Sequence, residues 1–250
     1  MFVVSLVTYC SRLPSVGETV IGETFMKHYG GKGANQAVAA ARLERKVILC
    51  GMIGNDTFGH DYKRQLQLEG CGVDNILQCS QHTGIASITV ESSSGANTIV
   101  VTPGANFELR EDQIAGFRAA IQKSNMLICQ NELRIDRTIQ ALKIGREVGC
   151  LTIFNPAPAH IDCFGAIPFS DIICPNEVEL SLLTSLPVSS HEEIMLAATT
   201  LQTQQGARTV VITLGSRGAC VLTEQGEFHS IPAPHVTSVD TVGAGDCFIG

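Results

Sequence analysis

Short, continuously apolar runs alternate with longer segments of helical period through the middle of the chain. This alternation constrains the fold more than any other feature of the sequence. The apolar runs are typical of strands that are covered on both faces, and they occupy residues 47–51, 126–129, 151–154, 171–174 and 209–214. Apolar residues three and four apart predict helices over residues 33–45, 56–69, 134–148 and 191–205. Strand–helix alternation predicts an α/β fold, a three-layer sandwich with a mostly parallel central sheet.

Two stretches depart from this pattern and are typical of half-exposed strands. Residues 85–101 alternate apolar and polar side chains around a serine- and glycine-rich turn, which predicts an antiparallel hairpin. Residues 17–25 are also rich in β-forming side chains. We expect these strands, within about 13–27 and 84–102, to form a small β-lid on one domain that spans 1–250. An exposed lid face could pair with a second subunit, so we expect a homodimer.

The composition argues against several classes of protein. Hydrophobic residues make up 44% of the chain and charged residues 16%, as in globular proteins, and the net charge of −7 opposes attraction to nucleic acid or anionic lipid. No run approaches the roughly 18 apolar residues of a membrane span. The ten cysteines form no Cys-x-x-Cys pair and the seven histidines show no metal-ligand spacing. This favours free thiols over disulfides or zinc, and a cytoplasmic location, with the nucleus also compatible.

The first motif that carries chemistry is Gly-Gly-Lys-Gly-Ala-Asn-Gln-Ala at residues 30–37, at the start of a predicted helix. Paired glycines allow close approach of the backbone to a ligand, and the helix start supplies unpaired amides. Asn35 offers a donor and an acceptor to a hydroxyl group, and Lys32 adds a positive charge. The spacing matches neither the P-loop nor the dinucleotide-binding glycine pattern. A purely structural glycine turn fits this spacing equally well.

The second motif is Asp-Thr-Val-Gly-Ala-Gly-Asp-Cys-Phe at residues 240–248. Its glycines would leave amides free at a helix start, where they could receive the negative charge of a transferring phosphoryl group. Asp246 follows them, where a carboxylate could accept the proton of an attacking hydroxyl group. Taken alone, an aspartate that caps a glycine-rich turn is the commoner interpretation.

Together the two motifs resemble the two signatures of the ribokinase-like carbohydrate kinase family, also called the PfkB family. The resemblance covers nearly the whole chain and continues through residues 54–59, 103–106, 155–158, 175–179 and 213–218. Within the family, the string at residues 30–37 is similar to the ribokinase branch. The resemblance implies a ribokinase-like fold and the ATP-dependent phosphorylation of D-ribose at its 5-hydroxyl. It also implies Mg²⁺ and a monovalent cation, K⁺, as cofactors.

The resemblance further implies roles for individual residues. The residues expected at the sugar are Gly31, Lys32, Gly33, Ala34, Asn35, Glu132 and Asp246. Those expected at ATP are Asn176, Thr213, Leu214, Gly215, Ser216, Arg217, Gly218 and Gly245. Asp246 is the expected general base, beside an anion hole formed by Gly243, Ala244 and Gly245. Glu179 is expected to hold Mg²⁺ through water, and Asp240 with the carbonyl of Val242 to hold K⁺.

The chain departs from the family pattern near both ends. Ser5 stands where the family has an aspartate that binds the sugar hydroxyls. Hydrogen bonds to charged groups contribute roughly 1.5–3 kcal/mol each, so we expect ribose binding to be weaker by about one to two orders of magnitude. The helix that follows Gly243 has room for barely more than one turn before Gly250, which is expected to leave the anion hole poorly formed. We therefore expect a chain that is truncated at both ends.

Two further interpretations stay open. The chain could be a catalytically impaired product that only binds nucleotide or a partner subunit, or a kinase of the same family for another sugar or nucleoside. An NAD-dependent dehydrogenase shares the fold class, but the sequence lacks the required glycine fingerprint after the first strand. Turnover of ribose with ATP separates these interpretations.

Overall fold

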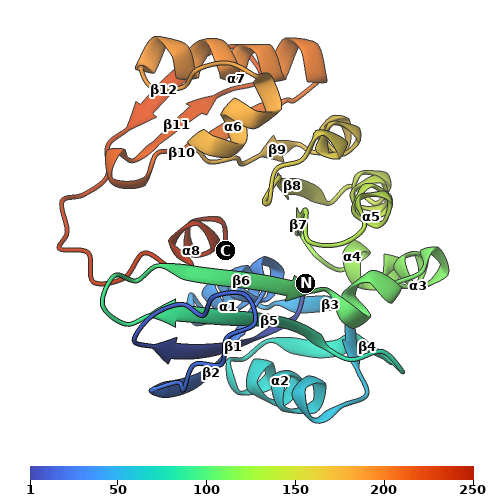
Figure 1. Ribbon diagram of the computed structural model, residues 1–250. Helices are drawn as coiled ribbons and strands as arrows, with labels where there is room; N and C mark the ends of the chain where they lie inside the picture. The colour runs from blue at the N-terminus through green and yellow to red at the C-terminus, as the bar shows by residue number, and fades with distance from the viewer. The chain divides into compact units, whose positions relative to one another are not determined.

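The computed structural model describes residues 1–250, and the chain divides into two compact units, Met1–Leu109 and Arg110–Gly250. Figure 1 shows strands and helices in both. Each unit has its own hydrophobic core, one centred on residues such as Tyr62 and Ile53, the other on residues such as Phe154 and Leu180. The expectation of one domain with a lid stays a prediction.

The first unit contains a four-stranded sheet in the order β2-β1-β5-β6. Its strands are β1 (Val3–Cys10), β2 (Thr24–Gly30), β5 (Gly84–Glu91) and β6 (Asn97–Thr102). β1 pairs parallel with β5 and antiparallel with β2, and β5 pairs antiparallel with β6. The predicted hairpin over residues 85–101 is therefore confirmed. The predicted β-structure over residues 17–25 is limited to Thr24 and Phe25.

The irregular segment before β2 has a local cause. Gly17 takes a positive φ of 81°, and Glu18 receives hydrogen bonds from Arg12 and from the amide of Ser15. These contacts close a turn in which the backbone is not extended. β-forming residues are therefore not sufficient to make a strand here.

Two helices and a parallel strand pair complete the first unit. These elements are α1 (Lys32–Arg42), β3 (Ile48–Gly54), α2 (Thr57–Leu68), β4 (Gly72–Cys79) and the 3₁₀ helix η1 (Gly104–Glu108). The Asp56 carboxylate caps α2 by accepting the amide of Gly59 at 2.7 Å, and it also accepts the amide of Thr83 at 2.8 Å. Burial opposes ionisation of Asp56, but these hydrogen bonds outweigh it and lower the pKa of the carboxyl group.

The second unit contains a six-stranded sheet in the order β12-β11-β10-β9-β8-β7. The strands are β7 (Met126–Gln130), β8 (Leu151–Asn155), β9 (Ile172–Ile173), β10 (Thr209–Thr213), β11 (Ala219–Leu222) and β12 (Phe228–Ile231). The first four are parallel, and β11 and β12 extend the sheet as an antiparallel hairpin. The mostly parallel sheet of the predicted α/β class is thus present in this unit.

The second unit also contains six α-helices and three 3₁₀ helices. They are α3 (Glu111–Gly116), α4 (Arg118–Gln122), α5 (Ile135–Glu147), α6 (Glu177–Thr184), α7 (His191–Gln205) and α8 (Ala244–Ile249), with 3₁₀ helices η2 (Ile161–Gly165), η3 (Ile167–Phe169) and η4 (Gly215–Arg217). α5 contacts β7 and β8, while α6 and α7 contact β10. Ser190 and Glu193 start α7 with reciprocal side-chain to amide hydrogen bonds, and Gly206 ends it at a φ of 75°.

The four predicted helices correspond to α1, α2, α5 and α7, and the five predicted strands to β3, β7, β8, β9 and β10. Strands β4, β11 and β12 and the short helices α3, α4 and α6 were not predicted. All ten cysteines are free thiols, and Cys247 is the exposed one. None of the helices combines the length and apolar character that a membrane span requires.

Candidate active site

Three neighbouring parallel strands of the second unit, β8, β9 and β10, end at the same edge of their sheet. The segments that follow them are joined by hydrogen bonds: Asn155 Nδ2 donates to the carbonyl of Cys174 at 2.9 Å, and the amide of Thr213 donates to the carbonyl of Pro175 at 3.1 Å. Asn176 and Thr213 also form a parallel bridge. Ligands of open α/β sheets bind at such carboxyl ends. We call the segments that follow β8, β9 and β10 the carboxyl edge.

Asn176 and Glu179 form the start of α6 at this edge. The amide of Glu179 donates to Asn176 Oδ1 at 2.8 Å, and Glu179 Oε2 accepts the amide of Asn176 at 2.9 Å. This reciprocal pair is a capping box, which accounts for the local structure without any ligand. Asn176 is exposed and Glu179 is buried. The two predicted nucleotide and metal residues thus lie together, held in a fixed mutual geometry.

The residues fit Mg²⁺ only in one mode of binding. No group of three or more His, Cys, Asp or Glu side chains is arranged to hold a metal anywhere in the chain. Mg²⁺ is often held by one or two carboxylates together with substrate phosphates and water. Glu179, a single carboxylate at the carboxyl edge, is compatible with that mode.

Two thiols lie close to the Glu179 carboxylate. Burial raises the pKa of Cys174 to about 12, and the negative charge of Glu179 adds to the effect. Burial likewise raises the pKa of Cys163, to which the charge of Glu179 contributes. Both thiols are therefore neutral at physiological pH and add no negative charge to the carboxyl edge.

The segment from Thr213 to Gly218 forms a tight loop at the end of β10. The amide of Leu214 donates to the carbonyl of Gly218 at 2.8 Å, across the short helix η4. Gly218 has a φ of 99°, and a Cβ atom there would lie 2.0 Å from the carbonyl oxygen of Ile231. Only glycine fits this position. Gly215 and Ser216 are exposed.

The predicted sugar residues Gly31, Lys32, Gly33, Ala34 and Asn35 lie in the first unit. They form the N-cap and first turn of α1, and Gly31 takes a φ of 104°. A Cβ atom on Gly31 would lie 2.3 Å from the carbonyl oxygen of Met1, so the chain itself requires this glycine. A Cβ atom on Gly30 would lie 3.7 Å from Ser5 Oγ. The serine that replaces the expected aspartate thus lies beside the glycine motif.

Glu132 and Asp246 lie in the second unit. Glu132 follows β7 in the bend before α5. Asp246 is the third residue of α8, where it is 8% exposed. Gly243, at a φ of 75°, is the N-cap of this six-residue helix.

The remaining residues of the second motif have local hydrogen bonds. The amide of Ala244 donates to the carbonyl of Thr241 at 3.1 Å, which engages one of the three amides expected in the anion hole. Gly245 is therefore the better candidate for contact with an anion. The amide of Val242 donates to Asp240 Oδ1 at 2.9 Å. The two predicted K⁺ residues thus belong to one turn.

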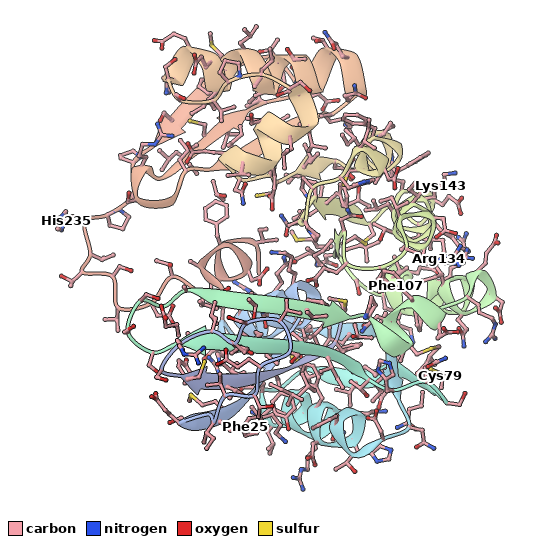
Figure 2. All side chains as sticks on the ribbon, viewed as in Figure 1. Phe25, Cys79, Phe107, Arg134, Lys143 and His235 are labelled. Carbon is pink, nitrogen blue, oxygen red and sulfur yellow. The ribbon has the colours of Figure 1, made fainter.

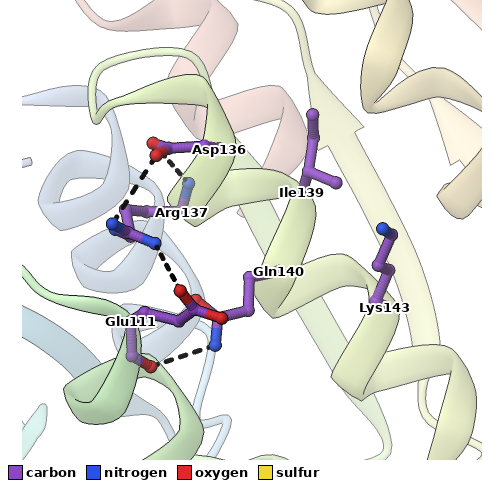
Figure 3. Close-up of a pocket in the computed structure, with 6 residues that line it drawn as sticks. All are labelled: Glu111, Asp136, Arg137, Ile139, Gln140 and Lys143. Atoms are coloured by element: carbon purple, nitrogen blue, oxygen red, sulfur yellow. Dashed lines mark hydrogen bonds and ion pairs between the residues drawn. The ribbon is translucent and has the colours of Figure 1, made fainter.

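A separate groove of about 380 Å³ runs along the outer face of α5. Figure 3 shows its lining residues, Glu111, Asp136, Arg137, Ile139, Gln140 and Lys143. The Arg137 guanidinium lies between Asp136 and Glu111, at 3.6 and 3.8 Å from their carboxylate oxygens. No residue predicted from the sequence lines this groove, and its two acidic and two basic side chains select no ligand charge. We therefore assign it no functional role.

Sequence reasoning assigned no role to two residues that organise the carboxyl edge. Asn155 joins β8 to the segment after β9, and Glu177, the first residue of α6, pairs with Arg217 of the loop. The Asn155 contact spans 19 residues of sequence and the Glu177 contact spans 40. No local pattern could have indicated either one.

Comparison with known proteins gives one consistent result. The sequence profile described as "pfkB family carbohydrate kinase" matches residues 2–250. A ribokinase of Mus musculus is 41% identical over 249 residues, which cover 98% of this chain and 76% of the mouse protein. A deoxyribokinase of Salmonella typhi is 36% identical over 251 residues, which cover 99% of this chain and 80% of the bacterial protein.

A solved structure extends the comparison to the fold. The structure described as Arabidopsis thaliana ribokinase complexed with ribose and ATP matches with a TM-score of 0.90 at 28% identity. The match covers 99% of this chain and 80% of the plant protein. It confirms the fold class that the sequence predicted.

Proposed function

The chain belongs to the pfkB family of carbohydrate kinases, and from this premise we propose that it transfers the γ-phosphoryl group of ATP to the 5-hydroxyl of D-ribose. The observation that carries the choice of sugar is the 41% identity to a ribokinase over 98% of the chain. The residues expected at the sugar, Gly31–Asn35, lie together in the N-cap and first turn of α1. The products are ribose 5-phosphate and ADP.

In the proposed reaction, Asp246 acts as the general base. The 5-hydroxyl oxygen attacks the γ-phosphorus, the bond from that phosphorus to the bridging oxygen breaks, and the hydroxyl proton passes to the Asp246 carboxylate. The amide of Gly245, in the anion hole predicted with Gly243 and Ala244, offers a hydrogen bond to the transferring group. Catalysis of this kind depends mostly on positioning and on stabilising charge.

The carboxyl edge is the proposed nucleotide site. Asn176 and the backbone of the loop from Thr213 to Gly218 would contact the phosphates and ribose of ATP, and Glu179 would hold Mg²⁺ through water. When bound, Mg²⁺ neutralises negative charge on the phosphate oxygens. Asp240 and the Val242 carbonyl, which share one turn, are the proposed K⁺ ligands.

A purified-protein assay of ADP release tests the proposal. Asp246→Asn should lower kcat by about 10²–10⁴-fold, because a positioned base contributes that much. Cys247→Ser, on the next residue of the same helix, is the control and should keep the activity. Nucleotide binding without turnover of any sugar by the wild-type chain would instead favour the catalytically impaired alternative.

A second candidate substrate is deoxyribose. The 36% identity to a deoxyribokinase favours it, and so does Ser5, because a sugar with one hydroxyl fewer needs fewer carboxylate contacts. The ratio of kcat/KM values for the two sugars decides between them. Ser5→Asp should raise kcat/KM for ribose about tenfold or more, since each charged hydrogen bond contributes roughly 1.5–3 kcal/mol.

We also propose a homodimer formed through the four-stranded sheet of the first unit. Val100 on β6 and Phe25 on β2, which the strand pairing places on the same face of the sheet, are 66% and 63% exposed. Figure 2 labels Phe25. Val100→Glu should shift the sedimentation of the protein from dimer to monomer, and sedimentation of the wild-type protein as a monomer would overturn this proposal. The ten free thiols suit a reducing compartment such as the cytoplasm.

A further inference from the structure

Arg217 lies in the loop predicted to bind ATP, but its side chain is engaged elsewhere. Its Nη2 donates to Oε1 of Glu177, the first residue of α6, and its Nη1 donates to the carbonyl of Ser189 at 3.5 Å. One guanidinium thus joins the loop to the start of α6 and to the connection between α6 and α7. Arg217 is 48% exposed and Glu177 is 32% exposed.

The loop is fixed differently on its two sides. Toward β12, Gly218 is pressed against the backbone of residues 231–233, with no space for a side chain. On the other side, a Cβ atom added to Gly215 would meet no other atom within 4 Å. Backbone contacts join Thr213, the first residue of the loop, to the segment at Asn176, and the Arg217 side chain adds a connection from the far part of the loop to α6.

We propose that Arg217 and Glu177 form a positioning pair for the nucleotide, one that holds the exposed Gly215–Ser216 segment at a fixed distance from Asn176 at the start of α6. This inference rests on the proposed function, in which both segments contact ATP. Without the pair, the loop must be ordered when the nucleotide binds, and that ordering weakens the affinity. Neither side chain needs to touch ATP.

The expected effect is modest because the pair is partly exposed. Ion pairs of this kind contribute up to about 1 kcal/mol, so Arg217→Gln and Glu177→Gln should each raise KM and Kd for MgATP about three- to fivefold. KM for the sugar should stay unchanged, and kcat should change less than twofold. The double variant R217Q/E177Q should be no weaker in MgATP binding than either single variant, because both remove one interaction.

Two further variants separate positioning from other roles. Exchange of the charges in R217E/E177R should restore part of the MgATP affinity that either single charge reversal removes. The control is Arg118→Gln, which breaks an exposed ion pair with Glu147 in the same unit, outside the carboxyl edge, and should leave the MgATP affinity as in wild type. Thermal unfolding of each variant, followed by circular dichroism, shows whether the fold is retained.

The outcomes distinguish this inference from the proposed function. MgATP affinity is measured directly by calorimetry, and ribose turnover is measured separately. If the Kd shifts occur while ribose is not phosphorylated, the positioning pair stands and the choice of sugar fails. If ribose is phosphorylated but neither variant changes KM or Kd for MgATP, the inference is wrong. A large loss for Arg217→Gln with none for Glu177→Gln would also overturn it, since Arg217 would then contact the nucleotide itself.

Discussion

The two ends of the parallel strands β8, β9 and β10 are built from different kinds of contact. We call the side of the sheet where these strands begin the amino edge, in contrast to the carboxyl edge where they end. At the amino edge, Asp171 and Arg208 directly precede β9 and β10, and Thr152 is the second residue of β8. Asp171 Oδ2 accepts the amide and the hydroxyl of Thr152, both at 2.9 Å, while Asp171 Oδ1 accepts a hydrogen bond from Arg208. We call these three residues the amino-edge clamp. Their side chains satisfy one another and offer little to a ligand.

At the carboxyl edge, the same three strands continue into a capped helix start and a glycine loop. Backbone groups and small residues face outward there, and Gly215, Ser216 and Asn176 are exposed. The difference supports the proposal that nucleotide binding depends on the carboxyl edge and not on the amino edge. Changes at the amino edge should alter the free energy of unfolding and leave nucleotide binding unchanged, whereas changes at the carboxyl edge should alter nucleotide binding, with or without a loss of stability.

The largest effect is expected for Gly218→Ala at the carboxyl edge. The φ of 99° disfavours alanine, and the new Cβ atom would lie 2.0 Å from the Ile231 carbonyl oxygen, so the backbone must move. We expect the free energy of unfolding to fall by about 3 kcal/mol, with MgATP binding lost in the folded fraction. Urea unfolding and calorimetry measure the two quantities.

Gly226→Ala is the matched control for that change. Gly226 has a similar φ of 84°, but no atom lies within 4 Å of its Cβ position. The substitution should lower the free energy of unfolding by about 1 kcal/mol and leave MgATP binding intact. Equal losses in the two variants would show that backbone conformation, and not the contact with Ile231, restricts Gly218.

The next largest effect on the free energy of unfolding is expected for Asp171→Asn in the amino-edge clamp. The amide cannot accept as many hydrogen bonds and loses the attraction to Arg208, so we expect the free energy of unfolding to fall by about 2 kcal/mol. KM for MgATP should stay within twofold of the wild-type value. Glu224→Gln, which removes the other and more exposed partner of Arg208, should have a smaller effect on unfolding. A raised KM for MgATP in Asp171→Asn would contradict the separation of the two edges.

A third prediction concerns the pH dependence of stability. Burial opposes ionisation of Asp171, but hydrogen bonds from Thr152 and the charge of Arg208 outweigh it and hold the pKa of Asp171 below its ordinary value of 3.8. A lowered pKa in the folded state stabilises the protein above the ordinary value, and the contribution is lost as the pH falls through the lowered one. The free energy of unfolding should therefore decrease below about pH 4. Asp171→Asn should make this decrease shallower, as urea titrations between pH 5 and pH 3 can test.

The sequence was informative where the responsible contacts are local. Helical period located α5 and α7, and short apolar runs located β8 and β10, because each pattern reflects burial within one element. The capping pair of Asn176 and Glu179 could be placed together because the two residues are three positions apart. The hairpin of β5 and β6 was predicted from alternation in the same way.

Contacts between residues that are far apart in the sequence could not be predicted from it. Asp171 is 19 residues from Thr152 and 37 from Arg208, so the amino-edge clamp exists only once the strands are assembled. The need for glycine at residue 31 comes from the backbone of Met1, which the motif does not reveal. Predicted roles that depend on ligand contacts, such as that of Asp246, stay predictions for the same reason.

The smallest expected signal is the chemical labelling of two buried thiols, one at each edge. Cys150 directly precedes β8 and Cys174 directly follows β9, and burial raises the pKa of both, that of Cys174 to about 12. Neither should react with iodoacetamide at pH 8 in the native protein, while the exposed Cys247 should be labelled, as peptide mass spectrometry can show. Labelling of Cys174 before Cys150 would show that the carboxyl edge opens locally while the clamp holds the amino edge closed. Suppression of that labelling by MgATP would then locate the nucleotide at the carboxyl edge without any substitution.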